Sequence, residues 1–257
     1  SEVLKGKVWL LPKGFTLDSY KIVFSNKEIL TGYKNTILYT SVGVIVNLIM
    51  TIFAAYPLSR KDLQGRNVIT AFFAFTMFFS GGLIPTYLVI KQLGLVDNFW
   101  VMILPTAVSM WNVVIMRTFF ENSIPYELQE AAFIDGCSNI KILTTIILPL
   151  STSIIAVMVI FYGVAHWNAF FNALIYLSNE NKYPLQMILR QILIENQTDS
   201  LMQVGAGAGS EVTSERLMIY EGLKYAVVIV ASVPMLLLYP FAQKYFIKGV
   251  MIGAIKG

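Results

Sequence analysis

Charged residues are scarce in this chain of 257 residues: they make up 13% of it, against 56% hydrophobic residues. Soluble globular domains usually carry about 25% charged residues. The deficit is concentrated in apolar runs of membrane length, which excludes an ordinary soluble domain and predicts an all-α polytopic membrane protein. The net charge of +4 suits an anionic membrane surface, and no basic patch interleaved with aromatics indicates nucleic acid as a partner.

Cysteine and histidine are nearly absent, with Cys137 and His166 the only examples of each. A single cysteine cannot form an internal disulfide, so cysteine usage demands neither an oxidising nor a reducing compartment. His166 lacks a second histidine to complete a metal site. The sequence also lacks a G-x-x-x-x-G-K-[ST] phosphate loop, an H-E-x-x-H motif, paired membrane carboxylates and a Ser/Lys dyad. We therefore expect no catalysis, metal or cofactor in this chain.

Five apolar runs are candidate membrane spans, over residues 35–56, 68–90, 99–119, 148–172 and 223–243. An odd number of spans places the two termini on opposite faces of the membrane. Loop 57–67 and the C-terminal tail each carry three Lys or Arg residues, against one in 91–98, which places the first two in the cytoplasm. The six lysines of residues 1–34 argue the other way, and the internal loops are given more weight.

Two of these runs are expected to bend. The two glycines and the proline within 81–85 predict a kink at the far end of the second run. The fourth run belongs to an apolar stretch, 142–178, that as one helix would be nearly twice as long as the hydrocarbon core is thick. Breaks are therefore expected at Pro149 and at 166–168. After it, residues 184–195 predict an amphipathic helix whose apolar face consists of Leu185, Ile188, Leu189 and Ile192.

The segment 120–141 predicts a short helix between two spans. Glu127 and Glu130 lie in its early turns, where negative charge is favourable near the positive helix end. Ala131 and Ala132 would let a partner's backbone approach closely. A short rigid helix held at a sharp turn can transmit a push from another protein. The alternative is an ordinary amphipathic loop helix lying on the membrane.

The ends of this short helix also follow from the sequence. Pro125 fits the first turn, where its missing N–H costs nothing. Gly136 is suited to a left-handed cap at the C-terminal end. Ser138 is suited to cap the helix that resumes and enters the membrane.

Residues 130–149 read Glu-Ala-Ala-Phe-Ile-Asp-Gly, nine further residues, then Ile-Ile-Leu-Pro. This pattern resembles the EAA loop of the inner-membrane permeases of ABC importers, with one departure: Ser153 stands where many relatives carry a second proline. The resemblance implies a helix that docks into a cleft on an ATPase. The matching positions are Glu130, Ala131, Ala132, Gly136, Ile146, Leu148 and Pro149, and the implied coupling residues are Glu127, Glu130, Ala131, Ala132, Asp135 and Gly136.

The rest of the chain is similar to the carbohydrate permeases of that family, in particular the polysaccharide-type branch. The strings that carry the similarity include Phe15-Thr16-Leu17-Asp18-Ser19-Tyr20, Ser80-Gly81-Gly82-Leu83-Ile84-Pro85, Trp167-Asn168-Ala169-Phe170-Phe171 and Tyr183-Pro184-Leu185-Gln186. The resemblance implies a type I importer permease fold of six spans, five of them visible here. Residues 1–34 would then be an extracytoplasmic segment after a missing first span. Residues 35–257 would form the transmembrane permease domain, with a cytoplasmic coupling loop at 120–141 and an extracytoplasmic loop at 179–222.

The same resemblance implies a set of partners in a bacterial cytoplasmic (inner) membrane, which the chain would cross several times. They are a second permease subunit forming a heterodimer, two ATPase subunits that bind ATP and Mg, and an extracellular or periplasmic solute-binding protein. The transported solute would be a carbohydrate, either an oligosaccharide or a fragment of a polysaccharide.

Several polar residues lie in or near the spans and are candidates for the substrate path. Aromatic faces and amides bind sugars, and buried polar groups in a membrane face protein or a water-filled path. Interhelical hydrogen bonding is the alternative for Asn47 and Asn112, and an interface anchor is the alternative for Trp167. The candidates are Asn47, Asn112, Tyr162, Trp167, Asn168 and Asn172, and the neighbouring polar residues Ser109 and His166 share this setting.

The rival class is an ion-coupled secondary transporter of a small polar solute. Such carriers usually place ionisable residues deep within their spans as proton or sodium sites. Here the acidic residues all lie outside the five predicted spans. The sequence therefore favours the ATP-driven importer over the ion-coupled carrier.

Overall fold

The computed structural model describes residues 17–194, 222, 225–237 and 240, and within these residues every regular element is a helix. The chain divides into two compact units. One comprises Ser1–Thr36 with Asn179–Leu236, and the other Ile37–Ser178 with Leu237–Gly257. Helix α2 (Lys27–Ser59) contributes residues to both.

The first unit is built on α1 (Asp18–Ser25), the first turns of α2, the short η4 (Glu180–Lys182) and two further helices, Leu185–Ile194 and Tyr225–Leu237. Leu185, Ile188 and Leu189 are buried and Ile192 is half-buried, which confirms three of the four residues predicted for the apolar face. Two polar side chains of α2 hold the chain that leads into this helix. The Nδ2 of Asn35 donates to the carbonyl of Tyr183 at 3.0 Å, and the hydroxyl of Thr36 accepts from the backbone N–H of Leu185 at 2.8 Å.

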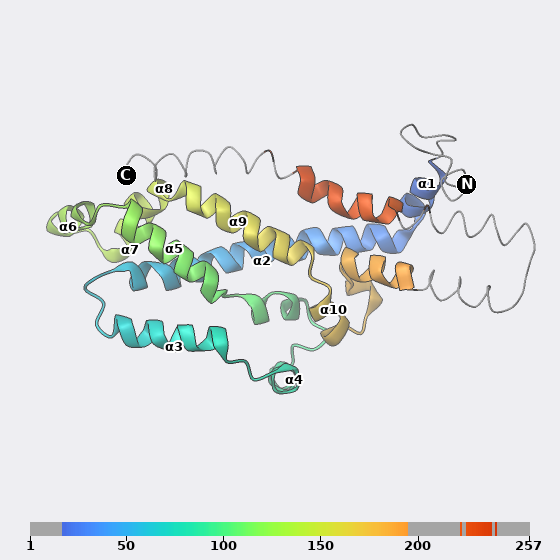
Figure 1. Ribbon diagram of the computed structural model, residues 1–257, viewed down its shortest axis with the longest axis horizontal. Helices are drawn as coiled ribbons and strands as arrows, with labels where there is room; N and C mark the ends of the chain where they lie inside the picture. The colour runs from blue at the N-terminus through green and yellow to red at the C-terminus, as the bar shows by residue number, and fades with distance from the viewer. Residues whose placement is uncertain (1–16, 195–221, 223–224, 238–239, 241–257) are drawn as a thin grey trace, which may run out of the picture. The chain divides into compact units, whose positions relative to one another are not determined.

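The second unit contains the remaining helices, and the loop that contains α6 lies beyond the ends of α5 and α9 (Figure 1). In chain order the elements are α3 (Arg66–Phe78), α4 (Leu83–Gln92), η1 (Phe99–Met102), η2 (Leu104–Thr106), α5 (Met110–Ser123), α6 (Tyr126–Ile134), α7 (Asn139–Ile142), η3 (Leu143–Ile147), α8 (Leu148–Leu150), α9 (Thr152–Trp167) and α10 (Phe171–Tyr176).

By length and composition, α2 is the one unbroken helix among the described residues that can cross a membrane. Three pairs of helices reach that length only if each bent pair counts as one span, which would raise the total to four. The bends are 113° between α3 and α4, 53° between η1–η2 and α5, and 83° between the segment from α7 to α8 and α9. Of the fifth predicted span, 223–243, the structure describes the apolar helix Tyr225–Leu237.

The breaks follow from local sequence. Gly82, with φ +84°, separates α3 from α4, so the kink predicted at 81–85 is a complete interruption. The predicted break at Pro149 is confirmed by the 83° bend that follows α8, and α9 ends at Trp167 as expected for the break at 166–168. The chain also widens into one π-helical turn, η3, just before this proline.

Two helices extend beyond the predicted spans. Helix α2 begins at Lys27, within the segment predicted to lie outside the spans, because a helix does not end where its apolar run ends. Glu28 in its first turn favours this extension, since negative charge is stabilised at the positive helix end. The span predicted at 99–119 starts as two short 3₁₀ turns and its α-helical part continues to Ser123. Asn98 starts this segment by accepting a hydrogen bond from the N–H of Trp100 at 3.1 Å.

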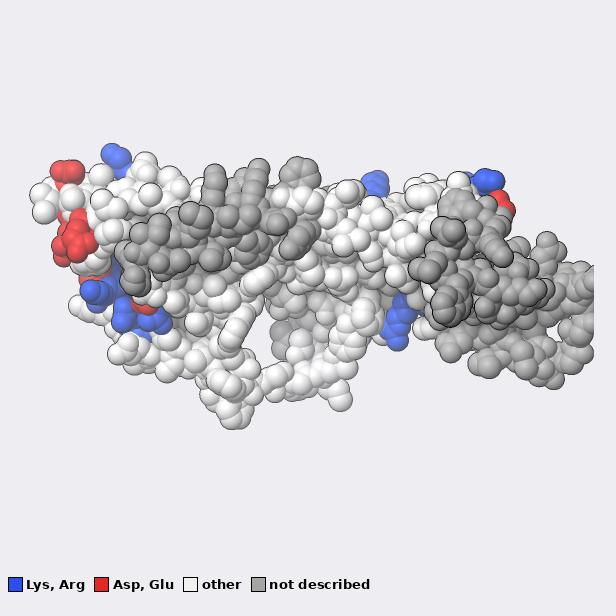
Figure 2. All heavy atoms as spheres, turned by 45° about the horizontal axis from the view of Figure 1, so that its top comes forward, with Lys and Arg blue, Asp and Glu red and all other residues white. Residues whose placement is uncertain are grey.

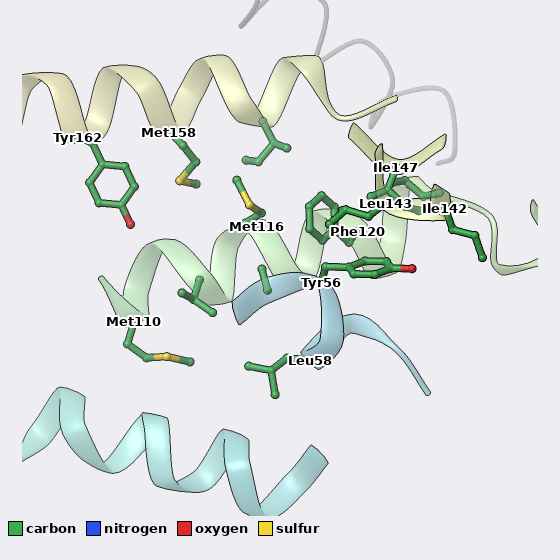
Figure 3. Close-up of a cluster of buried hydrophobic side chains, with 14 of the residues drawn as sticks. Tyr56, Leu58, Met110, Met116, Phe120, Ile142, Leu143, Ile147, Met158 and Tyr162 are labelled. Carbon is green, nitrogen blue, oxygen red and sulfur yellow. The ribbon is translucent and has the colours of Figure 1, made fainter. Parts of the chain in front are cut away.

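A cluster of buried apolar side chains fills the second unit between α2, α5, α9 and the segment from α6 to η3. Figure 3 shows Tyr56, Met116, Phe120, Leu143 and Met158 pointing into it. Side chains from the loop between the spans belong to the same cluster as side chains of the spans themselves. Close packing transmits displacement, so this loop is mechanically continuous with the helices around it.

Candidate functional site

Helix α6 presents two different faces. Gln129 and Ala132 are each 6% exposed and lie against the protein. Glu127, Glu130 and Ala131 are exposed on the other side, and Ile134 is 87% exposed. A large apolar side chain at that exposure, next to two carboxylates on a helix fixed from behind, is typical of a surface that another protein covers.

The ends of α6 are fixed by the residues that the sequence indicated. Pro125 stands one position earlier than predicted, as the N-cap residue just before the first turn. At the other end Asp135 is the C-cap and Gly136 has φ +75°. The N–H of Gly136 donates to the carbonyl of Phe133, and that of Cys137 donates to the carbonyl of Ala132, both at 2.9 Å. These two bonds make a Schellman motif, which needs a left-handed residue at the position of Gly136.

The turn after α6 leads directly into α7. The hydroxyl of Ser138 accepts a hydrogen bond from the backbone N–H of Lys141 at 3.4 Å, which confirms the predicted cap. Ile142 and Leu143, immediately afterwards, are buried in the cluster of Figure 3. The turn therefore fixes the direction in which α6 leaves the membrane-facing helices.

Replacing Gly136 with Ala should destabilise the protein by about 1–2 kcal/mol, because a side chain disfavours the left-handed conformation by roughly that amount. Gly163 in α9 is the matched control: beyond its chain neighbours and the backbone of its own helix, no atom lies within 4 Å of a Cβ built there, and its φ is not positive. Gly163→Ala should be neutral or slightly stabilising. Thermal unfolding in detergent, followed by circular dichroism, compares the two. Equal melting temperatures would contradict the proposed role of the cap.

Charged side chains cluster around α6. On the face shown in Figure 2, acidic side chains cluster at the end of the molecule that carries α6, with basic side chains beside them. Glu127, Glu130 and Asp135 are the acidic residues of this segment. The Arg117 guanidinium bridges Glu121 at 3.0 Å and Thr70 at 3.3 Å, which joins the neighbouring ends of α3 and α5.

A second candidate site is a mostly apolar cavity of about 190 Å³ with several polar side chains in its wall, between α5, α9, the start of α10 and the segment before α5. Its polar lining consists of hydroxyl, amide, imidazole and phenol groups, and no charged side chain lines it: Thr106, Ser109, Asn112, Tyr162, His166 and Asn172. Such groups match the hydroxyls of a neutral sugar unit. The cavity is smaller than the 300–1,000 Å³ typical of small-molecule sites, so an oligosaccharide would require it to widen.

Buried hydrogen bonds hold the wall of this cavity. The imidazole Nε2 of His166 and the side-chain oxygen of Asn47 are 2.6 Å apart, and the Asn47 amide donates to the carbonyl of Thr106. The hydroxyls of Thr51 and Tyr162 are 2.7 Å apart. These bonds join α2 to α9 and to the segment before α5. Asn47 therefore makes the interhelical hydrogen bonds that are the alternative to a role in the substrate path.

The structure brings together three of the six residues predicted for a substrate path: Asn112, Tyr162 and Asn172. Asn47 supports the wall from behind. Trp167 is 4% exposed and is not among the lining residues, and the Asn168 side chain turns back to donate to the carbonyl of Val164 at 3.0 Å. The prediction missed Thr106, which has no distinguishing signal in a sequence. In the described part of the chain, no group of His, Cys, Asp and Glu residues is placed to hold a metal.

Comparison with known proteins identifies this arrangement. The family model described as "Binding-protein-dependent transport system inner membrane component" matches residues 29–252. The chain belongs to this family. It is 44% identical to Protein LplC of Bacillus subtilis (strain 168), over 100% of this chain and 84% of that protein. It is 43% identical to the polygalacturonan/rhamnogalacturonan transport system permease protein YtcP of the same organism, over 100% of this chain and 87% of that protein.

The fold of the chain also matches a solved structure. A chain of a bacterial ABC transporter involved in the import of the acidic polysaccharide alginate matches with a TM-score of 0.82 and 33% identity, over 95% of this chain and 84% of that one. The resemblance to ABC importer permeases and the all-α type I permease fold are therefore confirmed. The protein is a non-catalytic, membrane-embedded permease component of an ABC importer, and the ion-coupled alternative is not supported.

Proposed function

We propose that this permease forms half of the translocation pathway of an ATP-driven carbohydrate importer, and that α6 receives the ATPase. A second permease would complete the pathway as a heterodimer. Two ATPase subunits would bind ATP and Mg, and an extracellular or periplasmic solute-binding protein would deliver the sugar. The chain would cross a bacterial cytoplasmic membrane several times, with 120–141 on the cytoplasmic side and 179–222 on the other.

The observation that carries the proposal is the two-faced α6. Its exposed face offers Glu127, Glu130, Ala131 and Ile134, while Ala132 on its other face belongs to the same buried cluster as residues of α2, α5 and α9. A force applied to the exposed face therefore reaches the membrane helices through packed side chains. Closure of the ATPase subunits on ATP would move α6, tilt these helices and switch the pathway between its outward-facing and inward-facing states.

For the substrate we propose an oligosaccharide released from a polysaccharide. Two observations support this: YtcP bears the name of a polygalacturonan/rhamnogalacturonan transporter, and the solved structure belongs to an alginate importer. The cavity beside α9 offers several hydrogen-bonding groups without charge among apolar side chains, in keeping with passage of sugar units. Asn112, Tyr162 and Asn172 would contact a sugar unit that enters this cavity.

The proposal predicts what accompanies this chain in gently solubilised native membranes. Affinity purification followed by mass spectrometry should recover a second permease, an ATPase and a solute-binding protein in stable proportion. The recovered binding protein should then bind oligogalacturonides, alginate oligosaccharides or a neutral maltooligosaccharide when screened by calorimetry. Recovery of the chain alone would contradict the assembly, and a binding protein that takes only amino acids or peptides would contradict the carbohydrate substrate.

A further inference from the structure

Arg60 follows α2 and is buried although it carries a charge. The residue is 6% exposed, and its guanidinium donates two hydrogen bonds to the Asp62 carboxylate, from Nε at 2.8 Å and from Nη2 at 2.7 Å. The third nitrogen donates to the hydroxyl of Tyr56 at 3.2 Å. Tyr56 is itself part of the buried cluster between the spans. The guanidinium is thus fixed in direction by the end of α2 and the turn that follows.

The same guanidinium lies over an aromatic ring of α6. Its carbon atom is 4.6 Å from the centre of the Phe133 ring, near the C-terminal end of that helix. The next residue, Lys61, holds its ammonium 5.2 Å from the centre of the Tyr126 ring, at the first residue of α6. Cations over aromatic faces attract the ring quadrupole, more strongly when water is partly excluded. Two successive cations of one loop thus hold both ends of one short helix.

The spacing of the two rings explains how both cations contact the same side of α6. Tyr126 and Phe133 are seven residues apart, which is close to two helical turns, or roughly 10 Å along the axis. They therefore lie on nearly the same side of α6, and Gln129 and Ala132, between them in the sequence, are buried. Phe133 is itself 40% exposed, whereas Glu130 takes no part in the two cation–ring contacts.

We propose that Arg60 is a positioning residue that, together with Lys61, clasps α6 to the end of α2 so that the two move as one body. The proposal rests on the proposed function, in which α6 receives the ATPase. Lysine cannot replace Arg60 here, because the contact uses a planar fork whose three nitrogens bond Asp62 and Tyr56 while its central carbon lies over the Phe133 ring. The clasp would deliver the motion of α6 to the longest membrane helix of the described chain.

The ion pair inside the clasp is insensitive to physiological pH. Hydrogen bonding from Arg60 lowers the pKa of Asp62 below its ordinary value of 3.8. A lowered pKa contributes stability that is fully present above the ordinary value and is lost only as the pH falls through the lowered one. The clasp should therefore hold unchanged from pH 8 to pH 5.

The test measures whether α6 and α2 move together in the assembled importer. Spin labels are placed on the natural Cys137, just after α6, and on Ile45→Cys, an exposed position of α2. The partner subunits are made free of cysteine. In the parent complex, double electron–electron resonance should give one narrow distance distribution that is the same with ADP and with ATP. Arg60→Ala, Arg60→Lys and Phe133→Leu should each at least double its width once ATP is added.

Phe133→Leu keeps the bonds of Arg60 to Asp62 and Tyr56, so it separates loss of the clasp from loss of folding. Lys141→Gln, which removes an exposed cation from α7, is the matched control and should leave the distribution narrow. Narrow, nucleotide-independent distributions in all three clasp variants would overturn the proposal. The ATPase retained on purification is measured in parallel. The clasp variants should retain the ATPase. If Glu130→Lys also retains the ATPase, then the ATPase does not dock on α6 and the proposed function itself is refuted.

Discussion

Glu130→Lys should leave the permease folded and inserted in the membrane but unable to hold its ATPase. Glu130 is exposed on α6, so the substitution disturbs no internal contact of the described chain. If the ATPase covers this face, a reversed charge is buried against groups arranged for a carboxylate. Truncating or mispairing one member of a buried charged contact costs about 2–5 kcal/mol, which corresponds to about 30-fold or more in affinity. Sugar uptake should fall with the amount of ATPase retained.

The measurement is the ratio of ATPase to permease after affinity purification, with uptake in proteoliposomes as the functional readout. Glu180→Lys is a matched control, because Glu180 is also exposed and lies in the other compact unit. It should retain the ATPase at the parent level. If Glu130→Lys retains the ATPase as well, α6 is not the surface on which the ATPase docks.

Gly43→Ala should destabilise the membrane domain by about 2 kcal/mol, although replacing Gly with Ala inside a helix ordinarily stabilises by about 1 kcal/mol. A Cβ at position 43 would lie 2.6 Å from Cε1 of the His166 ring. The ring cannot simply turn aside, because it is buried and bonded to Asn47. Overpacking costs typically 1–3 kcal/mol, and separating a buried hydrogen-bonded pair costs about as much again. The clash therefore outweighs the gain in helix propensity.

A double-mutant cycle isolates this contact. In a His166→Ala background the obstacle is gone, so Gly43→Ala should become neutral or stabilising, with a coupling energy of about 2–3 kcal/mol. Reversible unfolding in mixed micelles, monitored by circular dichroism, supplies the four free energies. Additive effects of the two substitutions would show that Gly43 and His166 are not in contact.

Features that depend on a few neighbouring residues could be predicted from the sequence. The left-handed Gly136, the cap at Ser138, the bend after Pro149 and the buried face of Leu185 each follow from local chemistry or helical spacing, and the structure confirms them. The identity of the loop as an EAA-type segment followed from seven residues at fixed spacing, and family membership agrees with it.

Features that depend on contacts between residues distant in the sequence could not be predicted from it. Nothing in the sequence pairs Arg60 with Phe133, because cation–ring contacts have no periodic signal. Trp167 reads as an exposed sugar-binding or interface residue, but packing makes it 4% exposed. Thr106 lines the cavity, and its backbone carbonyl, a group that every residue carries, accepts the hydrogen bond from Asn47. Likewise, the start of α2 at Lys27 reflects continued backbone hydrogen bonding beyond the apolar run.

The most direct test of the central claim is photo-crosslinking from the exposed face of α6 in native membranes. A photoreactive amino acid replaces Ala131, and a control carries it at Phe78, an exposed apolar position of α3 that is 83% exposed. We predict that the probe at Ala131 forms an adduct with an ATPase identified by its phosphate-binding loop, while the probe at Phe78 does not. If the probe at Ala131 forms adducts only with lipid, or only with a second copy of this chain, the ATPase does not dock on α6.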